Sequence, residues 1–120
     1  MAMTPEAKVK AKVVKLLKEA GVYYFYASTH GFGRSGVPDL VCFLNGHFVG
    51  IECKAGKNKP TPLQEKEMAA IRTAGGTTLV VNEDNIGDVA KLIGEKIGYA
   101  GRLDMACRLR AIDDALCMLS

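Results

Sequence analysis

The sequence lacks any apolar run that approaches the roughly 20 residues needed to cross a lipid bilayer. Its first residues, MAMTPEAKVKAKVVKLL, are studded with lysine and lack the apolar core of a signal peptide. Only 4 prolines occur, and 48% hydrophobic with 24% charged residues is typical of folded globular proteins rather than of extended disorder. We therefore expect a soluble cytoplasmic protein without membrane contact, in the host cytoplasm if its source is viral.

Metal-binding cysteine motifs are also missing. The four cysteines stand at positions 42, 53, 107 and 117, and no pair has the CxxC spacing of a zinc site. All four lie in apolar stretches, so we expect them to be reduced core residues. With 120 residues, the chain is long enough for one compact domain and too short for two ordinary domains joined by a linker.

Positive charge is in excess in one part of the chain only. The net charge is +3, but residues 1–82 hold 11 Lys and Arg against 6 Asp and Glu, whereas residues 83–120 hold 5 against 7. A basic excess in the first two thirds suits an anionic partner there. A lysine-rich helix face that is simply solvated would give the same count.

The order of the predicted elements indicates an α/β fold. The strongest local signal is Asn45-Gly46, the preferred pair for a two-residue type I′ turn. Thr4-Pro5 and Thr61-Pro62-Leu63-Gln64 each combine an N-cap with a proline at the first helical position. The predicted elements are a helix over 5–20, a strand over 22–26, a hairpin over 37–54, a helix over 62–74, a strand over 77–82, a helix ending at 97 and a helix over 102–119.

A strand, a crossover helix and a second strand normally form a right-handed parallel unit, so the strands at 48–54 and 77–82 should share one sheet. The resulting order, αβββαβ, describes an α/β sandwich: a mixed sheet flanked by helices, with C-terminal helices added. We assign residues 1–97 to this core domain and residues 98–120 to a helical extension within the same compact unit.

The last predicted helix has an apolar stripe that must be buried against something. Its members follow a 4-3-4-3 spacing: Met105, Leu109, Ile112, Leu116 and Leu119. About two heptads are too few for an independent coiled coil. The stripe therefore either docks on its own domain or builds a dimer interface.

The predicted hairpin brings three charged side chains together. With a two-residue turn at 45–46, Asp39 lies opposite Glu52, and directly opposed residues have Cβ atoms roughly 4.5–5.5 Å apart on one sheet face. Lys54 shares that face because side chains alternate along a strand. Two carboxylates among apolar neighbours need a positive partner, and Mg²⁺ prefers such oxygen ligands. Alternatively, Asp39 begins the strand as a turn residue, and Glu52 and Lys54 are exposed charges on a half-solvated face.

Two further polar residues lie on inward-facing positions of the predicted helices. Glu6 stands three residues before Val9 on the apolar stripe, although a glutamate in the first helical turn also interacts favourably with the helix dipole. Gln64 shares a face with Met68 and Ile71, so its amide points toward the sheet unless the capping box uses it entirely.

These residues resemble a known family in order and spacing. Ser35-Gly36-Val37-Pro38-Asp39, Ile51-Glu52-Cys53-Lys54 and Thr61-Pro62-Leu63-Gln64, together with Glu6, are similar to the VRR-NUC branch of the PD-(D/E)XK nucleases. The resemblance spans residues 4 to about 93. The family's arginine-containing signature is absent in its literal form, because Leu40 follows Pro38-Asp39 and the next arginine is Arg72.

The resemblance implies a restriction-endonuclease-like core and a phosphodiester hydrolase that uses Mg²⁺ or Mn²⁺. Asp39, Glu52 and the backbone carbonyl of Cys53 would bind the metal, and Lys54 would be the catalytic lysine. Glu6 and Gln64 would complete the catalytic set.

The expected partner is DNA, with no nucleotide cofactor. For DNA contacts we select Arg34 in the glycine-rich loop and Lys57 and Lys59 after the catalytic strand, since flexible cations near the scissile bond bind phosphates. Any of the three could instead be solvated. Lysines 8, 12 and 15 are better explained as a solvated helix face, and we assign no role to His30 or His47.

Small standalone relatives resemble structure-specific endonucleases, which implies branched DNA such as four-way junctions and, for two symmetric cuts, a homodimer. The alternatives are a restriction- or homing-type endonuclease that cuts duplex DNA and a non-catalytic DNA-binding module.

Overall fold

The computed structural model describes residues 3–27, 34–97 and 102–119, and within these the side chains of 97, 102–109 and 111 are not described. The elements are α1 (Pro5–Glu19), β1 (Tyr23–Tyr26), β2 (Leu40–Leu44), β3 (His47–Cys53), α2 (Pro62–Thr73), β4 (Thr77–Val81), α3 (Gly87–Ile97) and α4 (Arg102–Leu119). All predicted elements are present, with ends displaced by a few residues. In the described part of the chain, no helix combines the length and apolarity of a membrane span.

Helices α1 and α2 begin where their capping residues require. The Thr4 hydroxyl accepts a hydrogen bond from Ala7 N at 3.1 Å. At α2, the Thr61 hydroxyl accepts from Gln64 N while Gln64 Oε1 accepts from Thr61 N, at 3.2 and 2.9 Å. Each helix also has proline at its start, where no intrahelical N–H is needed. The caps therefore place the first turns of both helices, which carry Glu6 and Gln64.

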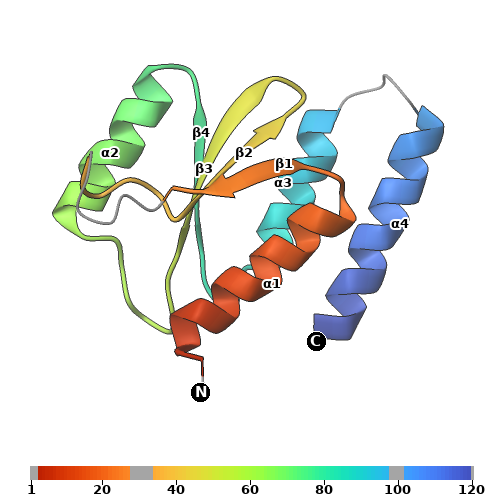
Figure 1. Cartoon of the computed structure of the whole chain (residues 1–120), viewed down its shortest axis with the longest axis horizontal. Coiled ribbons are helices and arrows are strands. Elements are labelled where there is room, and N and C mark those ends of the chain that lie inside the picture. Colours follow the sequence, from red (N-terminus) through yellow and green to blue (C-terminus); the bar gives the residue numbers. More distant parts are fainter. Residues whose placement is uncertain (1–2, 28–33, 98–101, 120) are drawn as a thin grey trace.

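The four strands form one mixed sheet in the order β1-β2-β3-β4. The first three are antiparallel neighbours, and β3 and β4 are parallel, as the crossover through α2 predicts. Figure 1 shows α2 on one side of this sheet and α1, α3 and α4 on the other. The predicted fold class, an αβββαβ core with C-terminal helices, is confirmed.

The hairpin between β2 and β3 has the predicted register. Leu44 pairs with His47 and Leu40 with Ile51, around a turn in which Asn45 and Gly46 have φ angles of 51° and 83°. Positive φ at both positions is what a type I′ turn requires. Because side chains alternate along β3, Ile51 and Cys53 face the core, and Glu52 faces the side of the sheet that carries α2.

The main core lies between the sheet and the helices α1, α3 and α4. Its buried members include Leu16 and Leu17 of α1, Ile93 of α3 and Ile112 of α4. Ala115 is buried with them, and Leu116 and Leu119 pack against the same cluster. Helix α4 therefore docks on its own chain, the first of the two alternatives, whereas the side chains of Met105 and Leu109 lie outside the described residues. The boundary at residue 97 stays a prediction.

The cysteine prediction is wrong for one residue. Cys42 and Cys53 are buried in the core as predicted, but Cys117 is exposed because it lies on the outward face of α4, beside the exposed Met118. The side chain of Cys107 lies outside the described residues.

Candidate active site

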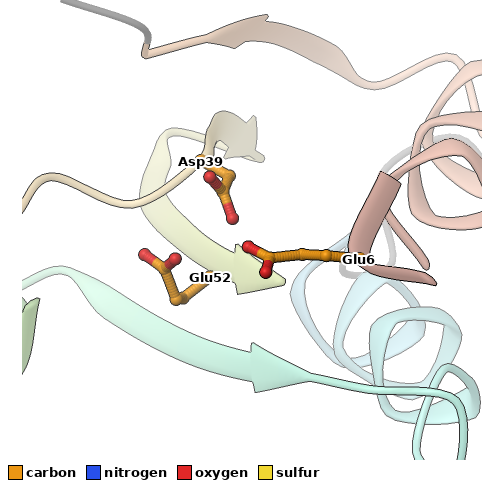
Figure 2. Close-up of side chains that lie close together, drawn as sticks. All are labelled: Glu6, Asp39 and Glu52. Carbon is orange, nitrogen blue, oxygen red and sulfur yellow. The ribbon is translucent and has the colours of Figure 1, made fainter. Parts of the chain in front are cut away.

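Three carboxyl groups from three separate parts of the chain converge at one end of the sheet. Glu6 comes from the first turn of α1, Asp39 from the residue before β2, and Glu52 from the end of β3. Each contributes an oxygen, and these oxygens lie within 4.8 Å of one another. Figure 2 shows the three side chains pointing toward a common centre. The structure thus brings together the three acidic residues selected from the sequence.

Glu52 is the most deeply buried member of this cluster, with 1% of its surface exposed. Its Oε1 accepts a hydrogen bond from Gln64 Nε2 at 3.1 Å, whereas its buried Oε2 has no partner. Burial, and after it the neighbouring carboxyl group of Asp39, raise the pKa of Glu52 to about 8. Lys54 lowers this pKa, and Glu6 raises it. An added positive charge would strongly favour the ionised form.

The position of Asp39 differs in one detail from the prediction. The β2–β3 ladder ends at Leu40 and Ile51, so Asp39 lies in a bend and is not a ladder partner of Glu52. Its carboxylate instead reaches across, because Oδ2 accepts a hydrogen bond from Cys53 N at 2.9 Å. The Asp39 carbonyl meanwhile accepts from Ala27 N at 3.0 Å. The side chain therefore replaces the backbone at this point of the ladder, and it still lies within reach of Glu52.

The backbone conformation and the packing around Gly36 explain why the Ser35-Gly36-Val37-Pro38-Asp39 motif has glycine at this position. Gly36 has a φ of 81°, and a Cβ atom there would lie 2.8–2.9 Å from backbone and side-chain atoms of Leu63. Only glycine combines this backbone conformation with such a close approach. The segment that carries Asp39 is thereby held against the first turn of α2, which carries Gln64.

Gln64 has both roles that the sequence left open. Its Oε1 completes the capping box with Thr61 N, and its Nε2 donates to Glu52 Oε1. The two ends of one amide group thus connect the start of α2 to the acidic cluster.

Lys54 and Cys53 follow Glu52 directly. Lys54 is half-buried, and its charge acts on Glu52, in agreement with a position on the same sheet face. The Cys53 thiol lies in the core, where burial raises its pKa to about 12. The assignment of the Cys53 carbonyl as a metal ligand stays a prediction.

The sequence reasoning missed Lys10. Its Nζ lies 3.5 Å from Asp39 Oδ1, so a cation already partners one of the clustered carboxylates. Lys10 is four residues after Glu6, and this spacing places both side chains on one face of α1. The spacing was therefore an available signal.

The second missed residue is Glu83, which holds the turn that follows β3. Both of its carboxylate oxygens accept from Gly56 N, at 2.9 and 3.0 Å, and these hydrogen bonds lower the pKa of Glu83. No local pattern links residues 56 and 83, because they meet only through the pairing of β3 with β4.

The residues predicted to contact DNA lie at the surface of the molecule. Lys57 and Lys59 are exposed in the segment between β3 and α2. Arg34 is also exposed, and its Nε lies 3.2 Å from Glu67 Oε1 of α2. Lys8 is exposed, while Lys12 and Lys15 are half-exposed. His47 is exposed at the start of β3, and His30 lies outside the described residues.

No family model matches the sequence. Over 81 residues, it is 36% identical to a protein named "Putative nuclease p44" from Acyrthosiphon pisum secondary endosymbiont phage 1. This similarity covers 67% of the present chain and 84% of the phage protein. The chain belongs to the family of this phage protein.

Proposed function

We propose that this protein is a divalent-metal-dependent DNA nuclease of the VRR-NUC branch of the PD-(D/E)XK superfamily. The observation that carries the proposal is the convergence of Glu6, Asp39 and Glu52, whose oxygens lie within 4.8 Å of one another. The name of the related phage protein, which describes a nuclease, supports it. The resemblance of the motifs around Asp39, Glu52 and Lys54 supports the choice of branch.

The residues present fit a bound Mg²⁺ or Mn²⁺. Glu52 Oε2 is buried without a partner, which is costly unless a cation or a proton joins it. Carboxylate oxygens are ligands that Mg²⁺ and Mn²⁺ prefer. Asp39 and Glu52, with the carbonyl of Cys53, would hold the ion. When bound, such an ion neutralises the negative charge that develops on a phosphate during hydrolysis.

The side chains around the cluster have distinct roles in this mechanism. Lys54 orients the attacking water or stabilises charge that develops on the phosphate. Gln64 fixes the orientation of Glu52 through the hydrogen bond to Oε1. Glu6 adds a third carboxylate, and Lys10 offsets the negative charge at Asp39. Water attacks phosphorus in line with the leaving oxygen, and the phosphodiester bond opposite the water breaks.

The finer proposal is a structure-specific endonuclease that acts on branched DNA such as a four-way junction. It rests on the family resemblance. A four-way junction has two strands to cut symmetrically, so this substrate calls for a homodimer with two active sites. The rival hypotheses are a restriction- or homing-type endonuclease that cuts linear duplex and a DNA-binding module without catalytic activity.

The test is cleavage of labelled four-way junctions, flaps, single strands and linear duplex in Mg²⁺, Mn²⁺ or EDTA. We expect cleavage with either metal and none in EDTA. Asp39→Ala and Lys54→Ala should each lower the rate by at least about a hundredfold, the usual effect of removing a group that stabilises charge in a transition state. Lys91→Ala, an exposed lysine on α3, serves as the matched control and should keep full activity.

Equal cutting in EDTA, or full activity in Asp39→Ala, contradicts the mechanism. Binding to every substrate without cleavage favours the non-catalytic module, and cutting at one site in plasmid DNA favours the restriction type. Light scattering at several protein concentrations measures the oligomeric state.

A further inference from the structure

Among the residues that the structure describes, only part of one face of the sheet is covered by a helix. On the side that carries α2, this helix packs over β4 and against Gly50 of β3, whose absent Cβ leaves room for Pro38 and Ile71. The rest of this face, formed by β1, β2 and the start of β3, carries exposed aromatic side chains. Phe48, Gly50 and Glu52 alternate onto this face along β3. The aromatic surface and the acidic cluster therefore lie on the same side of one sheet.

Strand pairing places four rings on this surface. Phe48 pairs with Phe43, Phe43 with Tyr23, and Phe25 with Val41, and directly paired residues share a face. The rings touch edge to face or tilted, with centroids 5.8–6.5 Å apart. Their exposed fractions are 69% for Tyr23, 44% for Phe25, 42% for Phe43 and 37% for Phe48. A contiguous exposed apolar patch of this kind marks a binding surface.

Part of this surface is hollowed into a pocket of about 460 Å³. Phe25 and Phe48 line it together with Val41 and Pro38, and Arg34 and Glu67 add a charged pair. In this pair Arg34 Nε lies 3.2 Å from Glu67 Oε1, while 75% of the arginine side chain remains exposed. Apolar walls with a few polar groups are the usual composition of a ligand pocket.

We propose that this pocket binds an unpaired nucleobase of the DNA substrate. A base has a flat π-face that stacks on aromatic rings whatever its identity, as in proteins that bind single strands. Arg34 offers hydrogen-bond donors to the polar edge of the base or to a neighbouring phosphate. Glu67 offers an acceptor to the polar edge of the base. This inference rests on the proposed nuclease function and specifies its substrate class.

The position of the pocket sets its distance from the cut. Phe48 precedes Glu52 by four residues on one strand, which corresponds to about 13 Å at the usual rise of a β-strand. A stacked DNA strand rises about 3.4 Å per nucleotide, so the bound base lies about four nucleotides from the scissile phosphate. The preferred substrate therefore has unpaired nucleotides close to the cut, as in a flap, a gap or a junction whose bases at the branch point are opened.

Charge favours nucleic acid over a second copy of the chain as the occupant. The exposed guanidinium of Arg34 lies at the pocket, and the exposed Lys57 and Lys59 follow β3, the strand that leads from Phe48 to Glu52. A phosphate backbone that leads to the acidic cluster would pass over this side of the molecule.

The test measures binding in EDTA by fluorescence anisotropy, with a duplex and the same duplex carrying a single-stranded extension. Phe25→Leu and Phe48→Leu keep an apolar side chain and remove the ring. Each should weaken binding to the extended DNA about tenfold, the usual range for loss of one stacked base, and leave binding to the plain duplex unchanged. Tyr23→Leu, on the same face but outside the pocket lining, is the matched control, and Phe25→Trp should retain binding.

A second measurement identifies the contact itself. A 5-iodouracil in the single-stranded extension should cross-link to Phe25 or Phe48 on irradiation, as mapped by mass spectrometry. The proposal is overturned if the leucine variants, with unchanged melting temperatures, bind both DNAs as the native protein does or lose affinity for both equally. It is also overturned if Phe25→Leu converts a dimer into a monomer while DNA binding is unchanged. Both measurements are made without cleavage, so an inactive protein would contradict the nuclease proposal and leave this test intact.

Discussion

At the scale of single residues, Glu52 is the carboxyl group of the site whose ionisation is most unfavourable. It is almost completely buried, has one oxygen without a partner and lies beside Asp39 and Glu6. A buried carboxylate of this kind is costly to ionise, which is why its pKa rises to about 8. The same features that destabilise the ionised side chain make it a favourable site for a cation. Lys10 neutralises only the Asp39 side of the cluster.

The first prediction concerns the pH dependence of stability without metal. The pKa of Glu52 is raised in the folded state from 4.5 to about 8, so the folded protein holds this proton more tightly than the unfolded chain does. The stabilisation that comes from this protonation of Glu52 is fully present below pH 4.5 and is lost as the pH rises through about 8. In EDTA, the native protein should therefore lose stability between about pH 5 and 8.

Glu52→Gln should remove this loss, because the amide stays neutral and still accepts the hydrogen bond from Gln64. At pH 8 we expect the variant to be more stable than the native protein by about 2–4 kcal/mol, since one pKa unit corresponds to about 1.4 kcal/mol. Urea unfolding from pH 4.5 to 8.5 in EDTA measures this difference. Parallel stability curves for the two proteins would contradict the prediction, and excess Mn²⁺ should reverse the order at pH 8.

At the scale of elements, the site depends on how β-strands and helix starts approach one another. Gly36 lets the segment before β2 lie against the first turn of α2, and Gly50 lets Pro38 and Ile71 approach β3. These close contacts position the ends of three elements without a direct role in the chemistry. Substitutions at such glycines should therefore affect stability first.

Gly36→Ala should destabilise the protein more than Gly46→Ala. Both glycines have positive φ, at 81° and 83°, so alanine costs about 1–2 kcal/mol of backbone strain at either position. A Cβ at Gly46 meets nothing within 4 Å, whereas one at Gly36 meets Leu63 at 2.8 Å and adds about 1–3 kcal/mol of overpacking. Chemical denaturation of both variants measures the difference, and equal losses would show that Leu63 moves aside freely.

The sequence permits prediction of elements better than of contacts between them. The hairpin turn is predictable because Asn45-Gly46 determines register locally, and the capping residues likewise determine where α1 and α2 begin. Register and alternation then place Glu52 on the α2 side of the sheet. The hydrogen bond from Cys53 N to Asp39 was not predictable, because the sequence does not show where a ladder ends. The contact between Glu83 and Gly56 depends likewise on tertiary pairing.

At the scale of the whole molecule, one hydrophobic core connects α4 to α1. Ile112 and Ala115 of α4 are buried with Val9, Val13 and Leu16 of α1, and Figure 1 shows the two helices side by side. Glu6 lies at the start of α1. The orientation of an acidic group in the site therefore depends partly on packing contributed by the C-terminal helix.

Ile112→Ala should show that α4 is part of the cooperative unit. Ile112 is 1% exposed, and truncation of a buried isoleucine to alanine costs about 2–5 kcal/mol. We expect a single unfolding transition, displaced to lower denaturant concentration, because α1 and α4 unfold together. Met118→Ala, on the same helix with 74% exposure, should change stability by less than about 0.5 kcal/mol. A separate early transition for α4 would contradict a shared core.

The burial of Cys53 has a consequence for the behaviour of the site under oxidative stress. A cysteine between Glu52 and Lys54 would be a liability if it were exposed as a thiolate, since peroxide and alkylating reagents attack that form. Here the thiol has no exposed surface and a pKa of about 12, so it stays protonated and out of contact with solvent. Burial thereby protects the cysteine of this strand, which lies between the proposed catalytic residues Glu52 and Lys54, from oxidation and alkylation. Iodoacetamide and hydrogen peroxide should leave Cys53 unmodified as long as the protein stays folded.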